Sequence, residues 1–278
     1  MGSVQSVDPT RAPRRLSFLP RWDMVARQRS YWTLTYLRTW KGSVFTSFVV
    51  PLFYVLAMGV LLGRYVDAGS GRLEGAPSYL AFVAPGLAAS YAMQIAMGET
   101  TWPVMGMIKW NRTYFAMTTS PLAVADIVAA QLLFVAFRVA STCGVFLLVM
   151  SFFGVFESAV GVLLAWPATV LVGMSFAGLL HAFSSTIRTE NGFSLVYRLL
   201  VVPLFLFSGA FFPISNLPAP LEWLARVTPL WQGVDLTRML VLGDVRIGAA
   251  VVHVVYLTTL SVVGWALAVR RLDQRLEV

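Results

Sequence analysis

The fold class is decided by residues 122–152, which read LAVADIVAAQLLFVAFRVASTCGVFLLVMSF. A helix needs about 20 mainly apolar residues to cross the hydrocarbon core of a bilayer. This run exceeds that length, and it carries only two charged side chains, Asp126 and Arg138. It predicts a helix that spans a membrane.

Five other apolar runs of sufficient length flank it, so the sequence predicts an all-α polytopic membrane protein with six transmembrane helices. The composition agrees, because 58% of the residues are hydrophobic, 12% are charged and the mean hydropathy is +0.72, whereas soluble domains carry about 25% charged residues. A soluble enzyme is excluded for lack of surface charge, and a disordered chain because such chains are poor in apolar residues. The predicted spans lie at 43–62, 79–98, 122–152, 160–183, 193–212 and 249–269.

Basic residues are distributed unevenly between the two sides of these spans. Of the 21 Lys and Arg residues, fifteen fall on the side of the two termini and five on the other side, with Arg138 inside a span. Because cytoplasmic flanks carry an excess of Lys and Arg, both termini are predicted to be cytoplasmic. This asymmetry explains the net charge of +8 without a nucleic-acid partner.

The N-terminal region is predicted to hold a basic, flexible tail at 1–20 and an interfacial amphipathic helix at 22–41. The second segment contains no Pro or Gly, and on a helical wheel four of its five aromatic residues fall within one arc, roughly opposite Arg27. Trp and Tyr favour the headgroup level of a bilayer, and basic residues favour anionic lipid. A merely flexible basic segment is the alternative. The residues concerned are Trp22, Arg27, Trp32, Tyr36 and Trp40.

The segment 213–248, before the last span, is too apolar for a solvated loop and too often interrupted by proline for a span. We expect a re-entrant pair of short helices that closes the outer end of a path through the bundle, with its charged groups near the outer surface. Proline suits the first turn of a helix, where a missing N–H costs little. An ordinary surface loop is the alternative. The residues that define the hairpin are Pro220, Trp223, Pro229 and Trp231, and its charged groups are Glu222, Arg226, Asp235 and Arg238.

Arg138 is the sharpest polar feature of the spans, since ionisable groups inside a membrane are costly and often functional. Gln131 and Thr142 share its helical face. Asp126 lies about 18 Å away along the helix at 1.5 Å per residue, so Arg138 needs another partner. It either lines a polar cavity or pairs with another span. Glu99, at the end of the second span, is placed to cap the helix that follows.

Catalytic and metal-binding motifs are absent from the sequence. Neither of the two lysines, Lys41 and Lys109, follows a glycine, so the chain has no Walker A sequence. The single cysteine, Cys143, allows no disulfide within the chain. No metal or cofactor is expected. Ser175 and His253 leave an intramembrane protease as an alternative, although the glycine that follows the nucleophile in rhomboid-type proteases is missing.

The segment MGMIKWNRTYFAMTT, at 105–119, is short, mixed in polarity and followed by Pro121. It indicates a small cytoplasmic helix that is presented to a partner outside the bilayer. A simple connector is the alternative.

Three stretches of the sequence resemble a known family. The run MIKWNRTYFAMTTSPLAVADIVAAQLL, at 107–133, resembles the cytoplasmic coupling segment of type-2 ABC exporter permeases. FLFSGAFFPISNLPAPLEWLARVTPLWQGVDLTRML, at 205–240, resembles their fifth span and outer hairpin. TWKGSVFTSFVVPLFYVLAMG, at 39–59, is similar to the first span of the branch with nodulation-factor (lipo-oligosaccharide) and anthracycline-type drug exporters.

The resemblance implies that residues 21–278 form an ABC type-2 transmembrane domain in a bacterial inner (plasma) membrane. Such a permease pairs with a second copy and docks on two copies of a separate ATPase subunit, which holds the ATP and Mg. The docking helix would lie at 105–116. Many permeases of the wider family carry an acidic-basic pair near this helix. The present chain has Lys109, Trp110, Asn111 and Arg112 there instead. The expected contact residues are Lys109, Trp110, Arg112 and Tyr114.

The permease would itself be non-catalytic and would export an amphiphile, such as a lipid-linked glycan, a glycolipid or a hydrophobic drug. An ion-coupled secondary transporter is the alternative. Carboxylates inside the spans are scarce, since only Asp126 qualifies and it lies near an end.

Overall fold

The computed structural model describes residues 18–63, 73 and 75–277, and each regular element among them is a helix. The predicted tail at 1–20 lies almost wholly outside the described residues. In chain order the elements are α1 (Trp22–Arg27), α2 (Arg29–Tyr54), the π-helical segment η1 (Val55–Leu62), α4 (Tyr79–Thr100), α5 (Trp102–Lys109), α6 (Thr113–Thr118), α7 (Val124–Phe152), α8 (Ala159–Thr186), α9 (Asn191–Val196), the π-helical segment η2 (Tyr197–Val201), α10 (Val202–Phe207), the 3-10 turn η3 (Ile214–Asn216), α11 (Ala219–Val227), α12 (Pro229–Leu242) and α13 (Ile247–Leu276).

Helices occupy each of the six positions where the sequence predicts a span. Four helical stretches are long and apolar enough to cross a membrane, namely Tyr79–Lys109, Val124–Phe152, Ala159–Thr186 and Ile247–Leu276. A fifth is added if Trp22–Gly42 and Ser47–Met58, which meet at a bend of 43°, form one span. The described part of the chain therefore supports four or five spans, and the number six stays a prediction.

The predicted fifth span, at 193–212, is not among these stretches. Its apolar helix runs only from Asn191 to Phe207. The chain leaves the helix there because Gly209 has a positive φ of 77°, a conformation that glycine adopts without steric cost. The last residues of the predicted span belong to the turn instead.

Helix α8 is the centre of the bundle and packs against α4, α7, α12 and α13. Its closest approach to α13 is made by two glycines. A Cβ on Gly178 would lie 2.7 Å from the backbone of Gly264, and a Cβ on Gly264 would lie 2.9 Å from the backbone of Leu179. Small residues of this kind let two membrane helices pack backbone to backbone.

The N-terminal helix predicted at 22–41 is broken at Gln28 into α1 and α2. Helix α2 continues into the predicted first span, and η1 forms the rest of that span. Part of its aromatic arc faces α7 rather than lipid, which corrects the expectation. Trp32 stacks on Phe134 at 4.8 Å, and the ring of Tyr36 meets Phe137 edge-on at 5.1 Å.

The outer members of the predicted arc behave as expected for a surface. Trp22 and Trp40 are exposed, and so is Arg27 on the other side of the helix. Trp32 and Tyr36 are only partly buried, which follows from their position, since α2 lies along α7. The interfacial location of α1 stays a prediction.

The segment 213–248 contains the two short helices that the sequence predicts. Pro220 lies in the first turn of α11, and Pro229 is the first residue of α12. Thr228 joins them, and its hydroxyl accepts the N–H of Trp231 at 3.3 Å. Trp223 on α11 is exposed, whereas α12 packs against α4 and α8.

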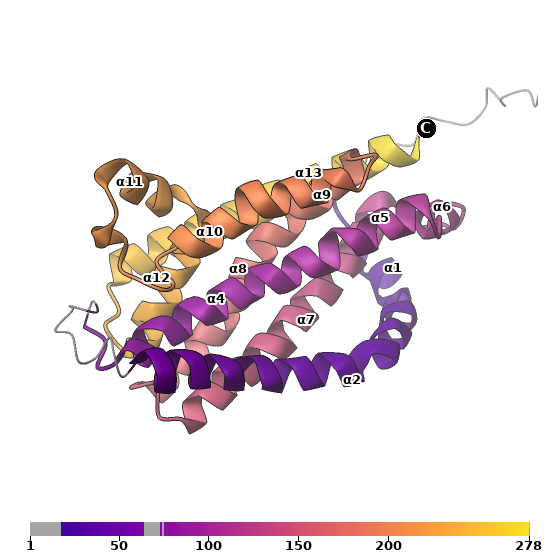
Figure 1. Cartoon of the computed structure of the whole chain (residues 1–278). Coiled ribbons are helices and arrows are strands. Elements are labelled where there is room, and N and C mark those ends of the chain that lie inside the picture. Colours follow the sequence, from indigo (N-terminus) through magenta and orange to yellow (C-terminus); the bar gives the residue numbers. More distant parts are fainter. Residues whose placement is uncertain (1–17, 64–72, 74, 278) are drawn as a thin grey trace, which may run out of the picture.

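These elements give the bundle two different ends (Figure 1). One end carries α1, α5, α6 and the C-terminus, and we call it the α5–α6 end. The opposite end carries α11 and α12, and we call it the α11–α12 end.

Candidate functional site: the polar network at the α5–α6 end

A sharp corner separates α5 from α6. The N–H groups of Trp110 and Asn111 both donate to the carbonyl of Gly106, at 3.1 and 2.9 Å, which ends α5. Arg112 then adopts the left-handed conformation (φ 49°), which is uncommon for a residue other than glycine. The expectation of one helix over 105–116 is therefore wrong, because the chain turns at Arg112 before α6 begins.

Three of the four predicted contact residues lie on the exposed side of this corner. Trp110 is 53% exposed and stacks on Trp102, with ring centroids 6.3 Å apart. The ammonium of Lys109 lies 5.9 Å from the ring of Trp110 and 3.3 Å from the carboxylate of Glu190. Arg112 is exposed beside them. We call Trp102, Lys109, Trp110 and Arg112 the aromatic-basic patch.

Trp102 is a member of this patch that the sequence analysis missed. Its signal was present, because Pro103 follows it directly. Proline in the first turn marks the start of a helix, and α5 begins at Trp102. The patch therefore spans both ends of α5.

Tyr114, the fourth predicted contact residue, is fully buried, so the expectation that it faces a docking partner is wrong. Its hydroxyl donates to the side-chain oxygen of Gln131 in α7. The same oxygen lies 3.1 Å from Nε2 of His181 in α8. Burial raises the pKa of Tyr114, so its phenol remains a hydrogen-bond donor. Tyr114 thus fastens α6 to α7 and α8.

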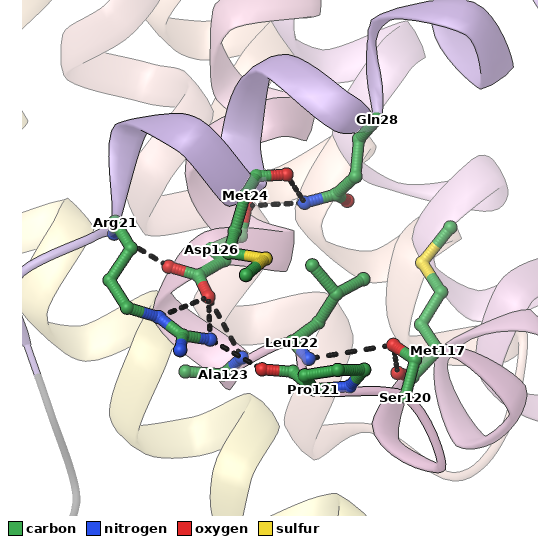
Figure 2. A network of polar contacts seen from close by, with 9 residues as sticks. All are labelled: Arg21, Met24, Gln28, Met117, Ser120, Pro121, Leu122, Ala123 and Asp126. Carbon is green, nitrogen blue, oxygen red and sulfur yellow. Dashed lines mark hydrogen bonds and ion pairs between the residues drawn. The ribbon is translucent and has the colours of Figure 1, made fainter.

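Asp126 forms a second connection at the same end (Figure 2). Its side chain is fully buried in the first turn of α7. One carboxylate oxygen accepts the backbone N–H of Arg21 at 2.7 Å, and the other accepts the Arg21 guanidinium at 2.8 Å. The second oxygen also accepts the N–H of Ala123 at 2.9 Å, which caps α7.

Two further bonds join α1 to this corner. The guanidinium of Arg21 donates to the carbonyl of Pro121, in the turn that follows α6. The amide of Gln28 donates to the carbonyl of Asp126 at 3.0 Å. Figure 2 shows these groups meeting at the start of α7. The N-terminal helix is therefore attached to the segment that connects α6 to α7.

Arg138 pairs with Glu99 of α4, with Nε 2.8 Å from the carboxylate. Of the two alternatives for Arg138, pairing with another span is the one that the structure contains. The expectation that Glu99 caps the next helix is wrong, since its carboxylate is engaged by Arg138 and α5 has no side-chain cap. The guanidinium also lies 5.8 Å from the ring of Tyr36, so α2, α4 and α7 meet here.

The three polar residues predicted to share one face of α7 have separate environments. Gln131 is buried against α6 and α8, whereas Arg138 is turned towards α4. Thr142 is buried further along the helix. The helical spacing was right, but neighbouring helices divide the face between them.

The α11–α12 end holds another polar cluster. The carboxylate of Asp235 lies 2.9 Å from the ring of His253 and 3.4 Å from the guanidinium of Arg246. Glu222 and Arg226 form a separate ion pair at 2.5 Å. Arg238 is buried, which corrects its expected place near the surface. Its guanidinium donates to the carbonyls of Phe82 (3.3 Å) and Gly209 (2.6 Å) and lies 3.9 Å from the Phe82 ring.

The residues that suggested a protease are engaged separately. The hydroxyl of Ser175 donates to the carbonyl of Val172 at 2.7 Å, and both ring nitrogens of His253 face Gln232 and Asp235. Among the described residues, no group of three or more His, Cys, Asp and Glu side chains is placed to hold a metal ion.

Comparison with known proteins finds one family and a set of relatives. The model of the ABC-2 type transporter family matches residues 26–242. Nodulation protein J of Rhizobium meliloti (strain 1021) is 29% identical over 261 residues, which cover 92% of this chain and 94% of that protein. Nodulation protein J of Rhizobium leguminosarum bv. trifolii is 32% identical over 240 residues, which cover 81% and 87% respectively.

Proposed function

Since this chain belongs to the ABC-2 type transporter family, we propose that it is the membrane-spanning subunit of an ATP-driven exporter whose ATPase is a separate protein. The family assignment makes it a transmembrane permease. The chain has no Walker A sequence, so ATP and Mg belong to the partner. With the positive-inside count, the α5–α6 end and both termini face the cytoplasm of a bacterial cell.

The observation that carries the proposal is the aromatic-basic patch. Trp110 and Trp102 are half-exposed at the tip of the bundle, beside Lys109 and Arg112. Exposed tryptophan beside arginine is typical of the residues that anchor protein interfaces. The basic side chains favour an acidic surface on the partner. We assign this patch to the docking of the ATPase.

Docking there gives the ATPase a mechanical connection to the bundle. A displacement of α5 acts directly on α4, which is joined to it at Thr101. A displacement of α6 reaches α7 through Tyr114, whose hydroxyl donates to Gln131, and reaches α8 because the same Gln131 oxygen contacts His181. Packed helices move as rigid units, so closure of two ATPase subunits would tilt these helices and open the path outwards.

A second copy of the permease would complete the path. Large apolar side chains remain exposed along α2, η1, α9, η2 and α10, including Phe45, Phe53 and Leu199. Such surfaces suit lipid tails or a symmetric partner. We propose a homodimer in the inner (plasma) membrane, bound to two ATPase copies, that exports an amphiphile. The hairpin of α11 and α12 would close the outer end of the path.

The experiment is co-purification of the tagged permease with a co-expressed ABC ATPase subunit from the same organism. Trp110→Ala in the aromatic-basic patch is compared with Trp223→Ala, which removes an exposed tryptophan at the opposite end. An anchor tryptophan contributes about 2 kcal/mol or more, so recovery of the ATPase should fall about thirtyfold for Trp110→Ala and stay unchanged for Trp223→Ala. Equal recovery with both variants rejects the docking assignment.

A further inference from the structure

The α11–α12 end contains a cavity of about 510 Å³ between α11, α12 and the first turns of α13. That volume falls within the range of about 300–1,000 Å³ that is usual for small-molecule sites. Its lining is strongly polar for a membrane protein. The charged residues around it are Glu222, Arg226, Asp235, Arg238, Asp244 and Arg246.

Positive and negative side chains balance in this lining, and the arginines already have acceptors. Arg226 is paired with Glu222, and Arg246 with Asp235. Arg238 is held by the carbonyls of Phe82 and Gly209. Because three arginines face three carboxylates, the lining carries no net charge, and an anionic ligand would gain no net attraction from it. A neutral ligand with many hydroxyl groups would only add hydrogen bonds, since a hydroxyl both donates and accepts.

The cavity also has an aromatic and apolar side. Trp231 lines it and is fixed edge-on to His253, with centroids 5.6 Å apart and planes at 81°. Ile214, Met239 and Leu242 lie around it. A sugar ring combines a rim of hydroxyl groups with faces of C–H groups, so it matches a wall that offers charged acceptors, charged donors and an indole together.

The walls of the cavity are tied to one another by hydrogen bonds. The amide of Gln232 donates to the carbonyl of Arg226 at 2.8 Å, and the hydroxyl of Tyr256 donates to the carbonyl of Val227 at 2.6 Å. These bonds hold the end of α11 against α12 and α13. The polar groups are therefore positioned before a ligand arrives, which reduces the ordering cost of binding.

We propose that this cavity binds an uncharged, hydroxyl-rich saccharide head group of the exported amphiphile at the outer end of the path. The inference rests on the proposed function, and it selects among the substrate classes that the sequence left open. A hydrophobic drug would desolvate the charged lining without giving it new hydrogen bonds, which is costly. A glycan-bearing lipid would form hydrogen bonds with the lining through its sugar, while its acyl chain stayed in the bilayer.

The test uses the full-length chain in lipid nanodiscs, without ATPase, in a Cys143→Ala background. Ser215→Cys places a reporter on the cavity wall, because Ser215 is exposed and lines the cavity. Val227→Cys is the matched control, because Val227 is exposed at the same end but does not line it. The rate of labelling by an impermeant maleimide is measured with cellobiose, which is neutral, and with glucose 6-phosphate, which is anionic.

Bound cellobiose should slow labelling at position 215 by the factor 1 + [L]/Kd, which is about threefold at a concentration of about twice its Kd, and leave position 227 unchanged. Glucose 6-phosphate should protect neither position. The inference is overturned if neither sugar protects position 215, if the phosphate protects it at least as well as cellobiose, or if both positions are protected equally.

A variant that changes the charge of the lining tests why the cavity should prefer a neutral sugar. Asp235→Asn keeps the size of the side chain but removes the charge that is paired with Arg246, so the lining gains a net positive charge. It should weaken protection by cellobiose and create protection by glucose 6-phosphate, whereas Asp273→Asn, at the C-terminal end of α13, should change neither. Unaltered preference in Asp235→Asn contradicts the charge argument.

These measurements and the co-purification experiment fail separately. Loss of saccharide protection with intact ATPase binding rejects the head-group site alone. Intact protection with no ATPase binding rejects the proposed exporter function alone.

Discussion

The guanidinium of Arg138 in α7 lies 2.8 Å from the carboxylate of Glu99 at the end of α4, and the two side chains are only 16% and 23% exposed. Glu99 stands just before Trp102, where the aromatic-basic patch begins. The ion pair thus joins α7 to the part of α4 that leads into α5. Because both side chains are largely shielded from water, each charged group is stabilised by the opposite charge of its partner.

Removing one charge of this pair should destabilise the fold. Arg138→Gln leaves Glu99 partly buried without its partner, at a cost of about 1–3 kcal/mol. The double variant Glu99→Gln, Arg138→Gln should lose less than the sum of the two single variants. Arg226→Gln, in the more exposed pair with Glu222, should cost about 0–1 kcal/mol. Thermal unfolding in detergent measures all four, and additive losses contradict a direct interaction.

Tyr114 should act on stability rather than on docking. Tyr114→Phe removes one buried hydrogen bond and should cost about 1 kcal/mol, while Tyr114→Ala also empties a core site and should cost about 3–5 kcal/mol. ATPase recovery per folded permease should stay constant in Tyr114→Phe. If recovery falls while the unfolding temperature is unchanged, Tyr114 contacts the ATPase after all.

Asp126 should hold α1 in place. In Asp126→Asn the charged attraction to Arg21 is lost, although the amide oxygen still accepts the N–H of Ala123. Val25 is buried on α1, so Val25→Cys in a Cys143→Ala background should label slowly with Asp126 present and about tenfold faster in Asp126→Asn, for a loss of about 1.4 kcal/mol. Equal labelling rates mean that α1 is held by other contacts.

The α11–α12 end should respond to acid through Asp235. Burial alone raises the pKa of Asp235, but the hydrogen bond and charge of His253, with Arg246 and Arg238, bring it below its usual value. A lowered folded-state pKa stabilises the fold above the unfolded value of about 3.9 and ceases to do so as the pH falls through the folded-state pKa. From about pH 5 to about pH 3, Asp235→Asn should therefore lose less stability than the parent chain. If stability falls with pH to the same extent in Asp235→Asn and in the parent chain, the pKa of Asp235 is not lowered by folding.

The positions of the helices followed from the sequence because burial in lipid imposes long apolar runs. Residues 122–152 became α7 almost residue for residue. Pro220 and Pro229 marked the starts of α11 and α12, because proline fits the first helical turn without the loss of a hydrogen bond. Gly209 shortened α10 through a backbone conformation that apolar periodicity does not encode. The same holds for Arg112, whose left-handed φ separates α5 from α6.

The side-chain environments were less predictable, because they depend on which helices become neighbours. Tyr114 followed two exposed basic positions in sequence, yet the turn at Arg112 directs it into the bundle. Arg238 was expected near water, but two backbone carbonyls from α4 and the Gly209 turn satisfy it inside. Arg138 illustrates the same limit, since helical spacing excluded Asp126 as its partner but only the packing of α4 on α7 supplied Glu99.

Site-specific crosslinking can show whether the ATPase docks on the α5–α6 end. In a Cys143→Ala background, Arg112→Cys and Val227→Cys each carry a short photoactivatable crosslinker on one end of the bundle, and the assembled complex with the ATPase is irradiated. The account predicts an adduct with the ATPase from position 112 and none from position 227. An intact complex that gives no adduct from position 112, or an ATPase adduct from position 227, would contradict it.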